Sequence, residues 1–458
     1  MKRFSRTGNY RTRLNAVIPG GAHTYSRGHD QFPSNAPQIL ARGKGAYVWD
    51  PSGRSFLDYG MGLRSVTLGY AHPEVDAGAI RQIRNGVNLT RPSTIELEAA
   101  ELMVHLIPSA EMVKFAKHGS TVTTAAVKLA RAATGRTYVC VPREHPFFSF
   151  DDWFIGSTVL TRGIPPAHRS STLVFNYNNI ASLQRFFDEH PGDIAAVIME
   201  PATTIDPCPA RCCTSRTIGK TCTNCPNHSR NFLHQVRELC DKYGTVFILD
   251  EMITGFRWHL QGAQTYFGVT PDLSTFGKGM ANGYALAALV GKREIMKCGS
   301  IDEPGMERTF LVSTTHGAEM SALGAFVAAL EVYRERHVID HIWAYGARLF
   351  EQFNEVCRSE GLQDYVGMEG NFVAMNYVTR DENQKPSLSF RTLFAQELVK
   401  QGVLMPWVAV SLAHRRRELA RTIEGVAAAL RVYRKALENG VKHYLKGPAI
   451  QPVFRKFN

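Results

Sequence analysis

The sequence has no apolar run of the roughly 18 residues that a membrane span requires. We therefore expect none of its 458 residues to cross a lipid bilayer. The N-terminus is basic, but it lacks the apolar segment of a secretory signal. These two features predict a cytoplasmic protein.

Acidic residues are few for a chain of this size. There are 41 of them against 53 lysines and arginines, which gives a formal charge of +12. The basic residues are spread along the chain, the densest run being 415–417, and no nucleic-acid-binding module accompanies them. We therefore expect no nucleic-acid partner, and instead a positive field that favours an anionic substrate or cofactor.

Hydrophobic residues make up 44% of the chain, an ordinary share for a globular protein. Short apolar runs alternate with amphipathic stretches. The clearest predicted strands are 137–141, 194–199 and 246–249, and the clearest predicted helices are 124–133 and 232–243. This alternation is typical of βαβ units and predicts an α/β fold with a mainly parallel sheet.

The length exceeds what one compact core usually supports, so we expect a large domain and a smaller one. The large domain is predicted over 70–330. The small α/β domain combines an N-terminal segment, 1–69, with a C-terminal one, 331–440, and 441–458 is interpreted as a tail. A long helix is expected over 320–338.

A lysine and an aspartate carry the most chemical information. Lys278 lies between two glycines, and Asp250 ends an apolar run that is predicted to be a strand. A buried lysine can form a Schiff base with an aldehyde, and a carboxylate can keep the pyridine nitrogen of pyridoxal phosphate (PLP) protonated. The alternatives are a surface lysine in a turn and a helix-capping aspartate.

The segments around this pair resemble a known family. Residues 248–257 and 271–278 are similar to the core signature of class III (fold-type I) PLP-dependent aminotransferases, in the branch of glutamate-1-semialdehyde 2,1-aminomutase. The resemblance runs from about residue 18 to 440. It implies that Lys278 forms the Schiff base and moves the proton, that Asp250 holds the ring nitrogen, and that the protein is a homodimer with shared active sites.

The resemblance also implies a phosphate site. Gly119, Ser120 and Thr121 align with the family's Gly-Ser/Thr cradle and precede a helix predicted over 125–133. Backbone N–H groups at a helix start bind phosphate well. The alternative is an ordinary Ser/Thr helix cap.

Further cofactor-binding residues follow from the same alignment. Phe147 matches the residue that stacks on the pyridine ring, although Phe148 stands where the family usually has histidine. Glu200 matches a carboxylate near the ring hydroxyl, and Ser313 and Thr314 match the hydroxyl that reaches the partner subunit's phosphate site. An aromatic core loop and a structural ion pair are the alternatives for Phe147 and Glu200.

The substrate is less defined. Arg27 lies where the family lines its substrate mouth and either clamps a carboxylate or is an exposed loop arginine. The mutase has a glutamate in the segment corresponding to 403–411, and this chain has no acidic residue there. We therefore predict an aminotransferase that moves an amino group from an amino acid, preferably glutamate, to a ketone or aldehyde acceptor of specialised or sugar metabolism. A mutase and a catalytically inactive binding protein are the alternatives.

Six of the nine cysteines fall between positions 208 and 240. Within an insertion at 205–230, four of them, with His228 nearby, have the spacing of a structural zinc site. The predicted ligands are Cys208, Cys212, Cys222 and Cys225. An iron–sulfur cluster, redox-active disulfides and reduced thiols are the alternatives.

Overall fold

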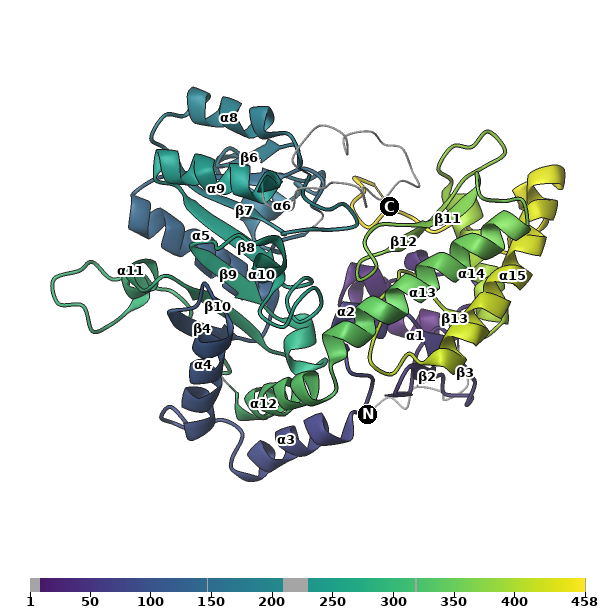
Figure 1. Ribbon diagram of the computed structural model, residues 1–458, viewed down its shortest axis with the longest axis horizontal. Coiled ribbons are helices and arrows are strands. Elements are labelled where there is room, and N and C mark those ends of the chain that lie inside the picture. The colour runs from purple at the N-terminus through teal and green to yellow at the C-terminus, as the bar shows by residue number, and fades with distance from the viewer. Residues whose placement is uncertain (1–8, 146, 209–229, 318, 458) are drawn as a thin grey trace. The chain divides into compact units, whose positions relative to one another are not determined.

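The computed structural model describes residues 9–145, 147–208, 230–317 and 319–457 (Figure 1). The chain forms two compact units. One, the middle unit, consists of 64–67, 72–341 and 456–458. The other, the terminal unit, is built from both ends of the chain and consists of 1–63, 68–71 and 342–455.

Among the described residues, the middle unit contains a seven-stranded sheet with the order β4-β10-β9-β8-β7-β5-β6. The strands from β9 to β6 run parallel, whereas β10 is antiparallel to both β9 and β4. The bounds are β4 (Met112–Ala116), β5 (Tyr138–Pro142), β6 (Thr172–Phe175), β7 (Ile194–Met199), β8 (Val246–Glu251), β9 (Leu273–Phe276) and β10 (Ala287–Gly291).

Helices pack against this sheet and against one another. The helix α5 contacts β4 and β7 to β10, α9 contacts β8, and α8 contacts β6 and α9. The bounds are α3 (Pro73–Arg84), α4 (Thr94–Leu106), α5 (Gly119–Thr134), α6 (Asp152–Ile155), α7 (Pro166–Arg169), α8 (Ile180–Glu189), α9 (Phe232–Tyr243), α10 (Ala263–Phe267), α11 (Arg293–Met296) and α12 (Met320–Glu335).

The central strands show why this sheet is internal. Every residue of β7 and β8 is buried, and both strands are rich in valine, isoleucine and leucine. Such continuous apolar strands are typical of parallel sheets covered on both faces. The polar residues that end β7 and β8 are therefore buried at the edge of the sheet where binding sites of α/β folds lie.

In the terminal unit, the described residues form a four-stranded sheet with the order β1-β2-β3-β13 and a two-stranded one, β11-β12. The helix α14 packs on α15, β12 and β13. The bounds are α1 (Tyr10–Val17), β1 (Arg42–Lys44), β2 (Tyr47–Trp49), β3 (Ser55–Asp58), α2 (Met61–Arg64), α13 (Val338–Ser359), β11 (Val366–Glu369), β12 (Asn376–Thr379), α14 (Leu388–Lys400), β13 (Val403–Leu404) and α15 (Arg416–Asn439).

The last residues return to the first ones within the terminal unit. The backbone N–H of Gln451 donates to the carbonyl of Asp30, and the side chain of Arg455 forms an ion pair with Asp30 at 2.7 Å. The segment interpreted as a tail is thus held by polar contacts to residues near the other end of the chain.

The predicted α/β class with a mainly parallel sheet is confirmed. Two predicted helices have different bounds. The helix expected over 320–338 ends at Glu335, and α13 begins at Val338, because His337 has a left-handed backbone with φ of 47°. The helix expected over 124–133 begins earlier, at Gly119. None of the helices in the described part of the chain has the length and apolar character needed to traverse a bilayer.

Candidate active site

Lys278 and Asp250 come from neighbouring parallel strands. Asp250 pairs in register with Thr275 of β9, and Lys278 lies just beyond the end of that strand. Asp250 is 2% exposed, and one carboxylate oxygen accepts from the N–H of Met252 at 2.9 Å and from the hydroxyl of Thr275 at 3.2 Å. Burial raises its pKa to about 6, against the opposing effects of these donors and of Lys278. The sheet thus fixes one oxygen of the carboxylate.

The backbone at Lys278 is strained. Its φ is 45°, a left-handed value that is rare for residues other than glycine, and it begins the short 3-10 turn Lys278–Ala281. Gly277 before it leaves no space for a side chain, since a Cβ there would lie 2.6 Å from the sulfur of Met252. Strain of this kind is common at functional sites, where surrounding structure holds it.

The electrostatic surroundings of Lys278 favour its neutral amine. Burial lowers its pKa below the usual value; Glu200 and Asp250 oppose this shift, and the positive charges of Arg64 and Arg257 add to it. A neutral amine is the form that attacks a carbonyl, so these surroundings suit a nucleophilic lysine.

Glu200 follows β7, next to β8, and is 5% exposed. Burial and the nearby Asp250 raise its pKa to about 8. Its backbone N–H donates to Nδ1 of His145 at 3.0 Å, so His145 carries its own proton on Nε2. That buried Nε2 has no hydrogen-bond partner among the described residues, which leaves an N–H available to a bound group.

The predicted phosphate-binding residues form the first turn of α5, where the N–H of Thr121 donates to the carbonyl of His118 at 3.2 Å and the N–H groups of Gly119 and Ser120 precede the helical hydrogen bonds. A Cβ at Gly119 would lie 3.0 Å from the sulfur of Met252, so the glycine keeps this approach open. Ser120 is buried, and its hydroxyl accepts from the N–H of Phe150 at 3.1 Å. The hydroxyl of Thr121 lies 3.2 Å from Nδ1 of His118.

Aromatic residues after β5 are tied to α5. The hydroxyl of Thr123 donates to the carbonyl of Phe148, and Nε1 of Trp153 donates to the hydroxyl of Thr124, each at 2.8 Å. Phe148 is 2% exposed, whereas Phe147, predicted to stack on the ring, is 46% exposed. Phe147 is therefore exposed in this structure, and Phe148 belongs to the core.

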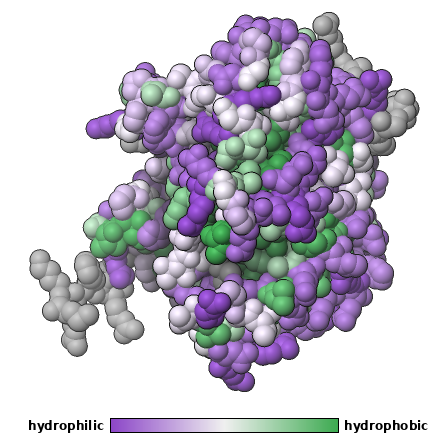
Figure 2. All heavy atoms as spheres, turned by 90° about the vertical axis from the view of Figure 1, so that its left-hand side faces the viewer, coloured by the Kyte–Doolittle hydropathy of each residue, from purple (hydrophilic) through white to green (hydrophobic). Residues whose placement is uncertain are grey.

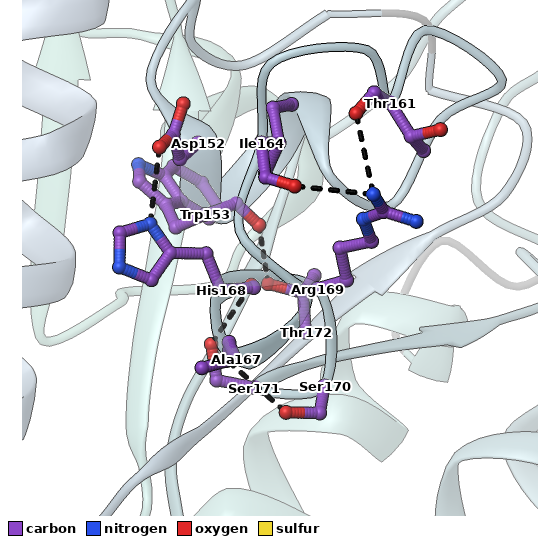
Figure 3. A network of polar contacts seen from close by, with 10 residues as sticks. All are labelled: Asp152, Trp153, Thr161, Ile164, Ala167, His168, Arg169, Ser170, Ser171 and Thr172. Carbon is purple, nitrogen blue, oxygen red and sulfur yellow. Dashed lines mark hydrogen bonds and ion pairs between the residues drawn. The ribbon is translucent and has the colours of Figure 1, made fainter.

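A network of polar contacts holds the chain that follows (Figure 3). Nδ1 of His168 lies 3.0 Å from the carboxylate of Asp152, and the hydroxyl of Thr172 donates to the carbonyl of Trp153. The guanidinium of Arg169 donates to the carbonyl of Ile164 at 3.1 Å. These hydrogen bonds hold the segment 152–172, which connects the aromatic residues to β6, at both of its ends.

Three further predicted site residues are exposed. Ser313 and Thr314 are exposed and belong to no helix or strand. Arg27 is exposed and belongs to the terminal unit.

Of the predicted zinc ligands, Cys208 is buried, and its N–H donates to the side-chain oxygen of Asn178 at 2.9 Å. The other three, Cys212, Cys222 and Cys225, lie outside the described residues. The described part of the chain contains no group of three histidine, cysteine or acidic side chains placed to hold a metal ion.

Three charged or ring-bearing neighbours were missed in the sequence. Arg257 is part of the motif 248–257, but the motif alone does not indicate that its charge acts on Lys278. Arg64 lies in a glycine-containing segment that carries no motif. His145 lies in the aromatic stretch, where attention fell on the phenylalanines.

The site residues fit PLP. Lys278 supplies an amine, Asp250 a carboxylate with one oxygen already fixed, and the start of α5 supplies N–H groups for a phosphate. The described residues therefore provide the functional groups that PLP binding requires.

Comparisons with known proteins agree with this fit. A family model described as aminotransferase class-III matches residues 25–204 and 224–424. The 3-aminobutyryl-CoA aminotransferase of Cloacimonas acidaminovorans (strain Evry) is 30% identical over 433 residues, 92% of this chain and 95% of that protein. The glutamate-1-semialdehyde 2,1-aminomutase of Nitrosospira multiformis is 36% identical over 290 residues, 61% of this chain and 64% of that protein.

Solved structures are similar over almost the whole chain. The PLP internal aldimine form of the FumI protein of Sphingopyxis sp. MTA144 has a TM-score of 0.81 and 26% identity, covering 94% of this chain and 97% of that one. An omega-transaminase from Sphaerobacter thermophilus has a TM-score of 0.78 and 24% identity, covering 94% and 99%.

Proposed function

Because this chain belongs to the class III aminotransferase family and is a PLP-dependent enzyme, we propose that it moves the amino group of an amino acid, preferably glutamate, to a ketone or aldehyde acceptor of specialised or sugar metabolism. The observation that carries the proposal is the convergence of Lys278, Asp250 and Glu200 at the carboxyl edge of three neighbouring strands.

Each residue has a proposed role. PLP supplies an electron sink when bound. Asp250 holds the proton of the pyridine nitrogen, the first turn of α5 (Gly119, Ser120 and Thr121) binds the phosphate, and Phe147 stacks on the ring. Glu200 lies near the ring hydroxyl, where its raised pKa lets it hold a proton.

Lys278 would hold the bound cofactor through its Nζ atom, and its amine would carry the proton removed from the substrate carbon. Its lowered pKa supports this second role, because a base must be neutral before it accepts a proton. The fixed oxygen of Asp250 keeps the carboxylate in place while the amine moves.

Replacement of Lys278 tests the proposal. Lys278→Ala is expected to lower the rate of amino transfer by about 10³-fold or more, because the proton has no carrier. Lys278→Arg keeps the charge and is expected to be equally impaired. Transfer is measured as 2-oxoglutarate released from glutamate; an undiminished rate in both variants contradicts the proposal.

A mutase is the second candidate, supported by the 36% identity to an aminomutase. The chain has no acidic residue over 403–411, which favours the transaminase. Incubation of the cofactor-loaded protein with glutamate alone distinguishes the two. A transaminase releases stoichiometric 2-oxoglutarate, whereas a mutase releases none.

We also propose a homodimer in which Ser313 and Thr314 reach the partner subunit's phosphate site. Large apolar side chains on the middle unit support a covered surface: Leu97 is 62% exposed and Phe310 71%. Figure 2 shows hydrophobic residues gathered among polar ones on one face.

Complementation tests this assembly. Lys278→Ala and the double variant Ser313→Ala/Thr314→Val are each expected to have low activity. Co-expressed, they form mixed dimers with one intact site, so about a quarter of wild-type activity should return. Activity no higher than the sum of the separate variants contradicts shared sites.

Zinc at Cys208, Cys212, Cys222 and Cys225 and a cytoplasmic location are further proposals, supported by the sequence alone. Elemental analysis of the purified protein is expected to give about one zinc per chain, lost in a Cys222→Ser/Cys225→Ser variant. A wild-type protein with no zinc contradicts the metal site.

A further inference from the structure

Arg64 stands on an unusual piece of backbone. Four successive residues, 61–64, have left-handed φ values between 40° and 67°, and three of them are not glycine. Such a conformation is unfavourable for residues other than glycine, so other contacts must hold the turn. One of these is a hydrogen bond at 3.4 Å from the guanidinium of Arg257 to the carbonyl of Arg64.

The residues after Arg64 lie against the turn that carries Lys278. A Cβ placed on Gly279 would be 2.7 Å from the hydroxyl oxygen of Thr67, and one on Gly283 would be 3.1 Å from Val66. The hydroxyl of Tyr333 donates to the carbonyl of Gly279 at 2.8 Å and fixes that turn from another direction. Arg64 is therefore near the reactive amine, within the same unit.

No carboxylate in the described part of the chain forms an ion pair with the guanidinium of Arg64. No hydrogen bond or ion pair of its side chain to any described residue is present, although the side chain is partly buried. Burial lowers its pKa, and the charge of Glu200 opposes the shift. Removing a cation from water without pairing it with an anion costs free energy, so an unpaired and partly buried arginine often has a binding role.

The neighbouring carboxylates do not fill this need. Burial and Asp250 raise the pKa of Glu200 to about 8, which favours its protonated form and weakens it as a partner for Arg64, and Asp250 faces the pyridine nitrogen in the proposed function. In the proposed function the first turn of α5 binds the cofactor phosphate. The planar guanidinium is thus free for another anion, and its fork geometry matches a carboxylate through two parallel hydrogen bonds.

We propose that Arg64 binds a carboxylate of the amino-acid donor and of the keto acid formed from it. This inference rests on the proposed function and adds a specificity-determining residue to it. The guanidinium of Arg64 attracts and orients the carboxylate of the substrate, and it takes no part in proton transfer.

Calorimetric titration of the cofactor-loaded protein with 2-oxoglutarate tests the proposal without turnover. The Kd of Arg64→Met is expected to rise about 100-fold, because a buried charge pair loses one partner. Arg64→Lys keeps the charge without the fork and should give a smaller rise. Arg81→Met, on the exposed face of α3, is the matched control and should bind as the wild type does.

Steady-state kinetics with two amino donors distinguish recognition of the carboxylate from recognition of the amine. The kcat/KM for glutamate should fall about 100-fold in Arg64→Met, mainly through KM, whereas that for 1-phenylethylamine, which has no carboxylate, should change by less than about threefold. An unchanged Kd for 2-oxoglutarate, or an equal loss with both donors, overturns the proposal.

The other failures are distinguishable. If Arg64→Met loses PLP affinity instead, measured from the visible absorbance of the bound cofactor, Arg64 serves the cofactor and the proposal is overturned. If Arg64→Met does not fold, Arg64→Lys decides by the same two measurements. A wild-type protein that binds 2-oxoglutarate and transfers no amino group refutes the proposed function and leaves the carboxylate site intact.

Discussion

Burial favours the protonated form of Glu200. It is 5% exposed, it lies near Asp250, and its pKa is raised from 4.5 to about 8. Between these two values the unfolded chain has lost the proton that the folded chain still holds. Unfolding therefore releases a proton in this range, and the stability of the folded state falls as pH rises.

Glu200→Gln should flatten this dependence. The free energy of unfolding of the cofactor-free wild type is expected to decrease by several kcal/mol between about pH 5 and pH 8 relative to the variant, because each unit of pKa shift corresponds to about 1.4 kcal/mol. Urea unfolding across this range measures it. Glu98→Gln, at an exposed position on α4, is the control and should keep the wild-type slope.

At this scale the sequence analysis singled out residues that belong to motifs and passed over those that do not. Lys278, Asp250 and Glu200 were proposed because each ends or follows an apolar run in a recognisable segment, and the structure places them at the ends of neighbouring strands. Arg64 was missed because its position depends on a left-handed turn, and two glycines nearby give no sign that Met61 and Leu63 would adopt that conformation as well. Buried polar contacts between distant segments, such as His145 with Glu200, leave no pattern in a single sequence.

The helices α3 and α12 meet through glycine. A Cβ on Gly78 would lie 2.5 Å from the carbonyl oxygen of Gly324, and a Cβ on Gly324 would lie 2.5 Å from the carbonyl oxygen of Gly78. Both distances are far below normal contact, so only two glycines permit this approach. The close packing positions α12, which also contacts the turn carrying Lys278.

Gly78→Ala tests this contact. In an isolated helix the change would stabilise by about 1 kcal/mol. Here the methyl group would push two backbones apart, which costs typically 1–3 kcal/mol or more, so a net loss of stability is expected. Ala77→Leu, one residue away and exposed, should change the free energy of unfolding by less than about 0.5 kcal/mol. A Gly78→Ala variant as stable as the control contradicts the prediction.

Elements with a clear apolar period were predicted best. The bounds of β7 and α9 were right to the residue because buried runs and a 3.6-residue period define them. The start of α5 was placed too late, since glycine, serine, threonine and valine are weak helix formers and give no periodic signal over 119–124. The break at His337 was missed because neither glycine nor proline marks it.

The net charge is a property of the whole molecule, and its effect is on association rather than on the fold. With 12 more positive than negative charges, the protein should attract dicarboxylates over distances up to the Debye length. The kcat/KM for glutamate is expected to fall severalfold when NaCl is raised from about 0.05 M to 0.5 M, where screening is strong. The same measurement with 1-phenylethylamine, which is not an anion, should change little; equal changes for both donors contradict the prediction.

The two ends of the chain meet in the terminal unit. Leu57 of β3 pairs in parallel with Val403 of β13, the side chain of Asn35 donates to the carbonyl of Gln396, and Gln451 bonds to Asp30. During synthesis, all strands of the middle unit's sheet therefore emerge from the ribosome before the C-terminal segments with which the first sixty residues pair. The nascent N-terminal segment must wait until its partner residues between 396 and 451 have been made, so ribosome-bound chains ending near residue 345 are expected to protect β7 and β8 from proteolysis and to leave β2 and β3 open to cleavage.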